Sequence, residues 1–206
     1  RVERAPPRSI LVCCFNRHAA HQLRTRLLDL VGDDARGVLV QTYHGLALRL
    51  LGLSLSRQTP APHDQRDFDR LILDAVALLE GTRTPAGLEP DEVRDRLLAG
   101  FRHILVDEYQ DIDAPQYAMI SALAGRTQAD ADQRLSIMAV GDDDQNIYAF
   151  RGANVRFIRQ FQKDYHAEVH YLVENFRSTR HLIEAANHVI ARGPDRMKAQ
   201  HPIRID

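Results

Sequence analysis

Short apolar runs that alternate with amphipathic stretches make up most of this chain of 206 residues. Four continuous apolar runs have the length of buried strands, namely residues 10–14, 38–40, 104–106 and 137–140. After the first run, Leu23, Leu27 and Leu30 recur at helical spacing, which predicts a helix directly after that strand. Strands that alternate with helices favour an α/β fold, in which a parallel sheet carries helices on both faces.

The segment from residue 53 to 101 breaks this alternation. Its first part, residues 54–63, contains Pro60 and Pro62, which interrupt regular structure. Its second part places five apolar residues at helical spacing: Phe68, Leu71, Ile72, Ala75 and Leu79. Another helix is expected to start near Pro90. The pattern therefore predicts a short helical insertion between two parts of one sheet. Near the end of the chain, residues 169–173 are predicted as a further strand.

An acidic pair follows the third apolar run. Asp107 and Glu108 would lie at the carboxyl end of a buried strand, where α/β proteins gather their ligands. A carboxylate there can hold Mg²⁺, and a second one can orient an attacking water molecule. Taken alone, such a pair is more often a solvated turn or a helix cap, and that interpretation is favoured for this stretch by itself.

Two further stretches carry polar groups suited to phosphate. The fourth apolar run leads into Asp142, Asp143, Asp144 and Gln145, and the Gln145 amide can bond both a phosphate oxygen and a water. A solvated acidic loop is the plainer interpretation of this stretch. Further on, Arg177 has the planar guanidinium that suits a phosphate, beside the aromatic ring of Phe176. The alternative there is a surface arginine beside a buried phenylalanine.

Together these stretches resemble motifs II, III and IV of the UvrD/Rep-type superfamily 1 DNA helicases. The matching segments are DEYQD at 107–111, GDDDQ with IY and RG at 141–152, and NFRS at 175–178. Upstream, residues 10–20 resemble motif Ia and residues 41–45 resemble motif Ib. The resemblance implies a P-loop NTPase fold of the RecA-like type and an ATP-dependent DNA helicase that moves on single-stranded DNA and unwinds duplex DNA.

The resemblance also implies a role for each matching residue. Asp107 would hold Mg²⁺, Glu108 would be the general base for water, and Gln145 would sense the terminal phosphate of ATP. Arg177 would act as an arginine finger, and Phe176 would stack on adenine. Phe176 departs from the family pattern, which commonly has Tyr at this place.

A single-stranded DNA track commonly combines aromatic rings that stack on bases with polar groups on the phosphates. The candidates here are Phe15, Asn16, Thr42, His44, Tyr148, Phe150 and Arg151. Phe150 stands where the family commonly has Trp. Core packing is the alternative for the aromatic residues.

In family terms, residues 1–52 and 102–165 would form an incomplete first RecA-like domain, with 53–101 as its insertion and 166–206 as the start of the second. The phosphate-cradling motif GxxxxGK[ST] is absent, since the two lysines, Lys163 and Lys198, are followed by Asp164 and Ala199. The chain is therefore expected to be a central fragment that is inactive alone. A helicase-like DNA-binding or scaffolding module without ATPase activity is the alternative, which the gene sequence upstream of Arg1 would decide.

Composition adds three expectations. The formal net charge of −1 means that affinity for nucleic acid would come from local arginine patches. No apolar run approaches the about 20 residues of a membrane span. Cys13 and Cys14 lie side by side within an apolar run, which favours buried reduced thiols and a cytoplasmic location.

Overall fold

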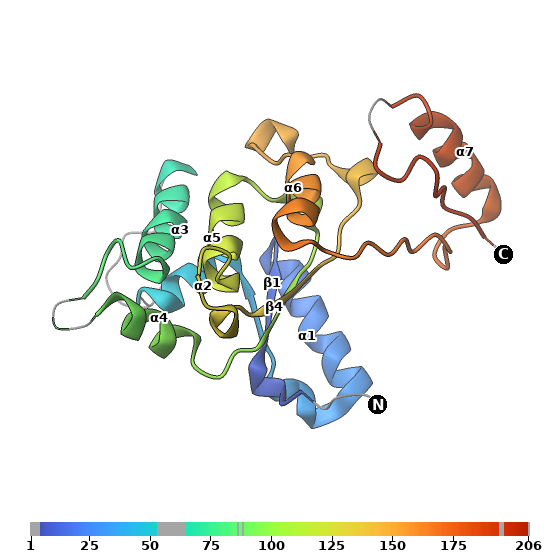
Figure 1. Cartoon of the computed structure of the whole chain (residues 1–206). Coiled ribbons are helices and arrows are strands. Elements are labelled where there is room, and N and C mark those ends of the chain that lie inside the picture. The colour runs from blue at the N-terminus through green and yellow to red at the C-terminus, as the bar shows by residue number, and fades with distance from the viewer. Residues whose placement is uncertain (1–4, 53–64, 86, 88, 194–195, 206) are drawn as a thin grey trace.

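A four-stranded parallel sheet lies at the centre of the computed structural model (Figure 1). The structure describes residues 5–52, 65–85, 87, 89–193 and 196–205. The strands are β1 (Ile10–Cys14), β2 (Leu39–Thr42), β3 (His103–Val106) and β4 (Ser136–Ala139). Their order is β2-β1-β3-β4, and each neighbouring pair is parallel. The four strands expected from the apolar runs are confirmed.

Helices follow these strands closely. The α-helices of the described residues are α1 (Arg17–Val31), α2 (Tyr43–Leu50), α3 (Gln65–Leu79), α4 (Pro90–Leu98), α5 (Ala114–Ala124), α6 (Arg156–Tyr165) and α7 (Arg180–Ile190). Side-chain caps fix where the first two begin, since Asn16 accepts a hydrogen bond from the Ala19 amide and Thr42 accepts one from the Gly45 amide. None of the described helices is both long and apolar enough to cross a membrane.

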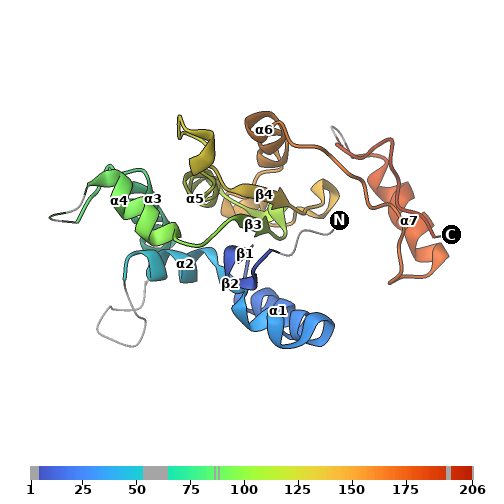
Figure 2. The same cartoon turned by 60° about the horizontal axis from the view of Figure 1, so that its bottom comes forward.

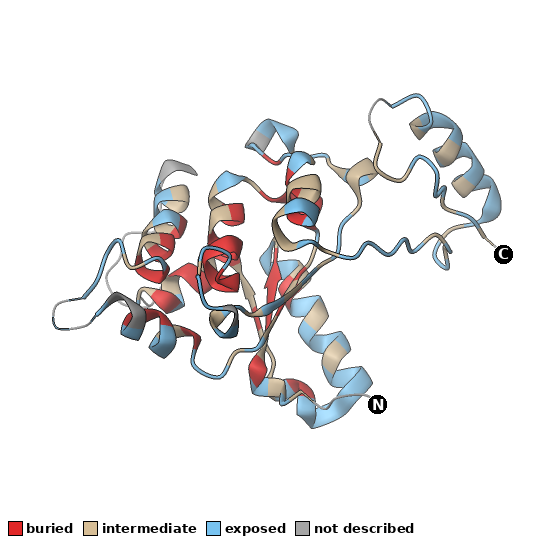
Figure 3. Ribbon diagram, viewed as in Figure 1, coloured by how far each residue is buried: buried red, intermediate tan, exposed pale blue. Residues whose placement is uncertain are grey.

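The helices cover both faces of the sheet, as predicted. Figure 2 shows α1 on one side of the strands and α5 and α6 on the other. The side chains of Val12, Cys14 and Val40 pack beneath α1 in a small cluster. The opposite face carries the main hydrophobic core, which includes Leu11, Ile104 and residues of α2, α3, α5 and α6. Figure 3 shows this core as the main concentration of buried residues in the chain.

The helical region predicted between the two parts of the sheet is present as α3 and α4. It shares the core of the sheet, because Ile72, Ala75 and Leu79 of α3 belong to the same cluster as Ile104 of β3. Residues 53–64, which include the proline-containing break, lie outside the described residues. Helix α3 is therefore anchored through apolar packing against the sheet domain.

Burial on both faces, expected of every strand in a parallel sheet, is wrong for β4. This strand lies at the edge of the described sheet, and its residues alternate between exposed and half-buried. The side chain of Met138 is 57% exposed, and Val140 just beyond the strand is 48% exposed. An apolar run thus marked a strand correctly without revealing that one of its faces is uncovered.

The strand predicted at residues 169–173 is also wrong. These residues form no regular strand, and the segment has only an isolated parallel bridge between Glu174 and Arg204. Among the described residues, no neighbouring strand offers these residues a continuous ladder of hydrogen bonds. An apolar pattern alone does not supply a pairing partner, and Leu172 remains 89% exposed.

The adjacent cysteines are free thiols on opposite faces of β1. Cys13 faces the main core, and burial raises its thiol pKa to about 12. Cys14 faces the cluster beneath α1, where burial first and the charge of Asp107 second raise its pKa to about 11. Both side chains are therefore protonated packing residues at neutral pH.

Candidate active site

Strands β1, β3 and β4 end at the same level of the sheet, so the residues that follow them lie along one edge. Cys13 pairs with Val106, and Val106 pairs with Ala139. The residues after β1, β3 and β4 therefore emerge side by side. In open α/β sheets this carboxyl edge is where ligands bind.

Asp107 is the first residue beyond β3. Its amide donates a hydrogen bond of 3.0 Å to the Cys13 carbonyl, which extends the sheet by one residue and fixes the start of the turn. The pKa of its half-buried carboxyl is raised by burial first and by the charge of Glu108 second. A group whose negative charge is disfavoured in this way gains from a nearby cation.

Glu108 has a left-handed backbone, with φ at 52° and ψ at 50°. This conformation costs a residue with a Cβ atom about 1–2 kcal/mol, so the surrounding turn must enforce it. The next amide, that of Tyr109, donates a hydrogen bond of 2.9 Å to the Val140 carbonyl and so ties the turn to the end of β4. The Glu108 side chain is exposed and accepts a hydrogen bond of 2.6 Å from Nε2 of Gln110.

Gln110 connects this turn to the loop after β4. Its side chain is only 2% exposed, and its Oε1 accepts a hydrogen bond of 3.0 Å from the Asp142 amide. Its main-chain carbonyl accepts another of 2.5 Å from Nδ2 of Asn146. The turn after β3 and the loop after β4 are therefore one hydrogen-bonded unit.

A third carboxylate, that of Asp111, is buried three residues after Glu108. Its side chain is 8% exposed, and Oδ1 has no hydrogen-bond partner among the described residues. Burial first and the charge of Glu108 second raise its pKa to about 6. The raised pKa means that the protonated form of Asp111 is favoured more than in an exposed aspartate.

The acidic loop, residues 142–145, is folded on itself by hydrogen bonds. Oδ1 of Asp142 accepts a bond of 3.0 Å from the Asp144 amide, and Oδ2 accepts one of 2.6 Å from Nε2 of Gln145. The amide of the predicted phosphate sensor is thus occupied within its own loop in this structure. The Gln145 side chain is nevertheless exposed, so it is accessible to a ligand.

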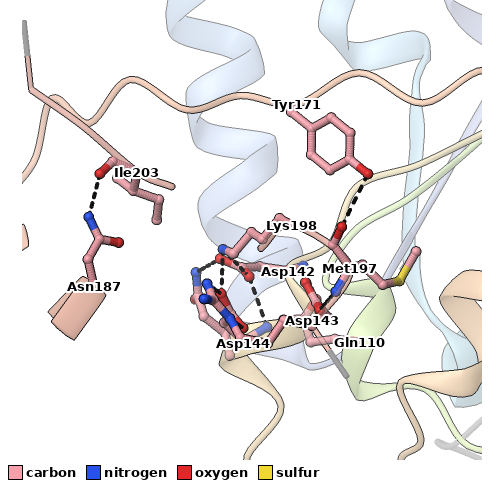
Figure 4. Close-up of polar contacts among 11 residues, drawn as sticks. Gln110, Asp142, Asp143, Asp144, Tyr171, Asn187, Met197, Lys198 and Ile203 are labelled. Carbon is pink, nitrogen blue, oxygen red and sulfur yellow. Dashed lines mark hydrogen bonds and ion pairs between the residues drawn. The ribbon is translucent and has the colours of Figure 1, made fainter. Parts of the chain in front are cut away.

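Basic residues from the far end of the chain balance the charge of this loop (Figure 4). Arg196 donates two hydrogen bonds to Asp144, of 2.7 and 2.6 Å, and these are the first cause of a lowered Asp144 pKa. Lys198 forms an ion pair with Asp142, and the Met197 amide donates a bond of 2.6 Å to Oδ2 of Asp143. The three aspartates thus form part of a polar network with the C-terminal segment, which the alternative interpretation of a solvated acidic loop did not include.

Phe176 and Arg177 lie in the segment that leads into α7. Phe176 is 88% exposed, so it is not the buried core residue that was the alternative interpretation. The Arg177 amide donates a hydrogen bond of 3.0 Å to Oδ1 of Asn175, and its side chain is exposed. No described contact joins Arg177 to Asp107 or Glu108, so the assigned roles of Phe176 and Arg177 stay predictions.

Three of the residues predicted to contact DNA form a row of aromatic rings. The ring of Phe15, after β1, lies 5.0 Å from that of Tyr148, and Tyr148 lies 6.2 Å from Phe150. Phe150 is 77% exposed, which disfavours the interpretation of Phe150 as a core residue. The structure therefore brings together rings from two loops that are more than a hundred residues apart in sequence.

The polar candidates for DNA contact have structural roles as well. Asn16 and Thr42 cap α1 and α2 at the carboxyl edge of the sheet. His44 packs its ring edge-on against Phe68, and burial lowers its pKa. The side chain of Arg151 lies outside the described residues. DNA binding by these four residues remains a prediction.

Sequence reasoning missed four residues of this site: Gln110, Asp111, Arg196 and Lys198. Gln110 and Asp111 stand within the DEYQD segment itself, where polar residues next to the buried Tyr109 were a usable signal. For Arg196 and Lys198 the sequence signal was weak, because it consisted only of two basic residues in a chain that also carries three consecutive aspartates. Their pairing joins residues 52 and 56 positions apart.

A parallel sheet with carboxylates beyond one strand and a polar loop beyond its neighbour is the arrangement of an open α/β domain and is consistent with the RecA-like class. The chain belongs to the UvrD/REP helicase family, since residues 1–61 and 56–166 match the family model of the UvrD/REP helicase N-terminal domain. The two matched pieces meet at the start of the region predicted as a short insertion.

Several known helicases are similar to this chain. ATP-dependent DNA helicase UvrD1 of Mycobacterium tuberculosis (strain ATCC 25618 / H37Rv) is 30% identical over 267 aligned positions, which cover 91% of this chain and 34% of the relative. DNA helicase II of Haemophilus influenzae is 40% identical over 131 positions, covering 64% of this chain and 16% of the relative. ATP-dependent DNA helicase PcrA of Staphylococcus aureus (strain NCTC 8325 / PS 47) is 26% identical over 258 positions, covering 92% and 34%. The chain thus spans about a third of the length of UvrD1 and PcrA.

Proposed function

We propose that this chain is part of an ATP-dependent DNA helicase of superfamily 1, which couples ATP hydrolysis to movement on single-stranded DNA and to unwinding of duplex DNA. The observation that carries the proposal is the joined edge of β3 and β4. There Glu108, the residue after Asp107, is tied through Gln110 to the loop that bears Gln145. The family match and the helicase relatives support the same reaction.

The donor set fits a magnesium ion at Asp107. Mg²⁺ prefers carboxylate and water oxygens, and Asp107 offers a half-buried carboxylate whose charge is disfavoured without a cation. The unpartnered Oδ1 of Asp111 adds to the local excess of acceptors among the described residues. Asp107 would hold the ion, whose positive charge would offset the negative charge of the ATP phosphates.

Glu108 is proposed as the base that accepts a proton from the attacking water. Its exposed carboxylate lies at the carboxyl edge of the sheet, and the left-handed turn holds its backbone in place. General-base catalysis contributes about 10²–10⁴-fold to a rate, so its loss is easily measured. Gln145 would then sense the terminal phosphate, by exchanging its bond to Asp142 for one to the nucleotide.

Phe176 and Arg177 would complete the site from the C-terminal segment. The exposed Phe176 ring is proposed to stack on adenine, and Arg177 to stabilise charge on the transferred phosphoryl group. Residues 1–52 and 102–165 then belong to the first RecA-like domain, with 53–101 as its insertion, and 166–206 begin the second. Such a site forms only when the two domains approach each other around ATP.

The DNA track is proposed to follow the row of rings formed by Phe15, Tyr148 and Phe150. Bases would stack on these rings, and Asn16, Thr42, His44 and Arg151 would lie near the sugar-phosphate backbone. A cytoplasmic location is proposed with this function, and the two buried thiols of β1 support it.

The intact protein tests the proposal through the substitution Glu108→Gln. We expect ATP turnover in the presence of single-stranded DNA to fall at least about 10²-fold, because the base is lost. The affinity for ATP, measured by titration with a fluorescent ATP analogue, should change little, since binding rests on other groups. Glu80→Gln, at an exposed position just after α3, is the matched control and should keep full activity. Wild-type protein that binds DNA without turning over ATP would favour the scaffolding alternative.

A further inference from the structure

Gln110 is a buried polar residue to which the proposed function assigns no role. It lies in the turn after β3, where its side chain bonds both the exposed Glu108 and the acidic loop, and it is only 2% exposed. Figure 4 shows Gln110 beside the aspartates of that loop. A buried amide is costly unless its donor and acceptor are both satisfied. The positions of its partners therefore indicate what the side chain holds in place.

The two ends of the Gln110 amide bind different parts of the site. Nε2 donates a bond of 2.6 Å to Oε2 of Glu108. Oε1 accepts a bond of 3.0 Å from the Asp142 amide. One planar group thus spans from the proposed base to the acidic loop, 32 residues further along the chain. Neither bond can lengthen by rotation of the amide without disturbing the other.

The fit around this amide is tight. A Cβ atom at Gly141 would lie 3.0 Å from Oε1 of Gln110 and 3.1 Å from Cβ of Tyr109. A residue larger than glycine at position 141 would therefore require the turn or the loop to shift by a few tenths of an ångström. Asn146 closes the far side of the contact, through its bond of 2.5 Å to the main-chain carbonyl of Gln110. The loop is held against Gln110 at both of its ends.

The loop also contains the proposed sensor. Asp142 receives the Gln110 bond through its backbone and binds the Gln145 amide through its side chain. A displacement of Gln145 by a phosphate therefore acts on Asp142, and through Asp142 on Gln110. The chain of bonds ends at the Glu108 carboxylate.

We infer that Gln110 is a positioning residue that couples the orientation of the Glu108 carboxylate to the position of the sensor loop. The inference rests on the proposed function, because it gives Glu108 and Gln145 their roles in hydrolysis. In this arrangement Gln110 does not contact the nucleotide. It holds the base in the orientation that the bound loop defines, so that water is activated only when the loop is in place.

Two substitutions in the intact protein separate the length of Gln110 from its hydrogen bonds. Gln110→Met keeps the length and removes both bonds, whereas Gln110→Asn keeps the amide and is too short to reach both partners. We expect each to lower kcat for DNA-stimulated ATP hydrolysis about tenfold to a hundredfold, the loss typical of a misplaced catalytic group. The KM for ATP should change less than about threefold, because ATP binding rests on other groups.

Gln116→Met is the matched control. Gln116 is likewise a buried glutamine, 5% exposed, and its side chain belongs to the capping box of α5. This variant should lose thermal stability with kcat unchanged. If Gln110→Met and Gln110→Asn lose kcat only in proportion to their loss of folded protein, as Gln116→Met would, Gln110 is a core residue and the inference is overturned. Failure of both Gln110 variants to fold assigns Gln110 to the core in the same way.

Hydrogen exchange in the absence of nucleotide tests the bond between the Asp142 amide and Oε1 of Gln110. The exchange rate of the Asp142 amide hydrogen, followed by nuclear magnetic resonance, should rise in Gln110→Met because its acceptor is gone. Unchanged protection at Asp142 would contradict the coupling.

The failure of this inference can be told apart from failure of the proposed function. If Glu108→Gln abolishes turnover and the folded Gln110 variants keep wild-type kcat, only the inference fails. If the wild-type intact protein shows no ATP turnover, the proposed function fails as well.

Discussion

The sheet region, residues 5–165, and the C-terminal segment, residues 166–205, are held together by different forces. The sheet region has a continuous core, whereas α7 has no buried residue (Figure 3). Leu182 and Val189 of α7 are 63% and 71% exposed. Apolar packing therefore fixes the carboxylates after β3, while the segment that carries Phe176 and Arg177 gains little from burial.

Polar contacts organise the C-terminal segment instead. Internally, Nδ2 of Asn187 donates a bond of 2.6 Å to the Ile203 carbonyl, and the rings of Tyr171 and His201 stack with centroids 4.0 Å apart. Toward the sheet region, Arg196 and Lys198 bind the acidic loop. These ion pairs depend on the distances between a few charged atoms, whereas a packed core rests on many apolar contacts at once. The comparison suggests one rigid and one adjustable half of the proposed site.

The largest effect should come from emptying the core of the sheet region. Ile120 of α5 is fully buried, and Ile120→Ala should lower the free energy of unfolding by about 2–5 kcal/mol. The matched substitution in the other region, Leu182→Ala at a position 63% exposed, should change it by less than about 0.5 kcal/mol. Urea unfolding followed by circular dichroism measures both. Equal losses in the two variants would remove the distinction between the regions.

A smaller effect, dependent on pH, should come from the buried Asp111. Its pKa is about 6 in the folded chain, against an ordinary value of 3.8, so the folded state binds its proton more tightly than the unfolded state. Asp111 therefore contributes stability near pH 4 that is lost as the pH rises through about 6. Asp111→Asn, which cannot become charged, should melt about 2–4 °C above wild type at pH 8, the shift expected for ~1 kcal/mol in a chain of this length.

The difference between Asp111→Asn and wild type should shrink toward zero near pH 4, where Asp111 is largely protonated. Asp34→Asn is the control, because Asp34 is an exposed carboxylate outside the site. Differential scanning fluorimetry across this pH range measures all three proteins. A gain for Asp111→Asn that is the same at pH 4 and pH 8 would show that burial of the charge is not its cause.

The sequence was informative wherever local pattern decides the structure. The apolar runs at 10–14 and 104–106 coincide with β1 and β3, the two interior strands of the sheet. The DEYQD and GDDDQ segments located both halves of the β3–β4 edge. The aromatic row of Phe15, Tyr148 and Phe150 was anticipated as a set of candidates, although its geometry was not.

Features that depend on distant partners were not predictable. Residues 169–173 are apolar enough for a strand, yet a strand also needs a neighbour that pairs with it. The role of Gln110 depends on an amide 32 residues away, and that of Arg196 on a carboxylate 52 residues away. The residues around one position do not show which distant residue it will contact.

The proposed hydrolytic site is divided between a rigid sheet edge and a C-terminal segment positioned by ion pairs. The most direct test is a double-mutant cycle on the Arg196–Asp144 pair, with DNA-stimulated ATP turnover of the intact protein as the readout. We expect Arg196→Gln and Asp144→Asn each to reduce turnover about fivefold or more, and the double variant to be no slower than the slower single one. Arg36→Gln is the control, since it breaks the exposed pair with Asp33, away from the site. Single variants with wild-type turnover, or single losses that multiply in the double variant, would contradict the claim.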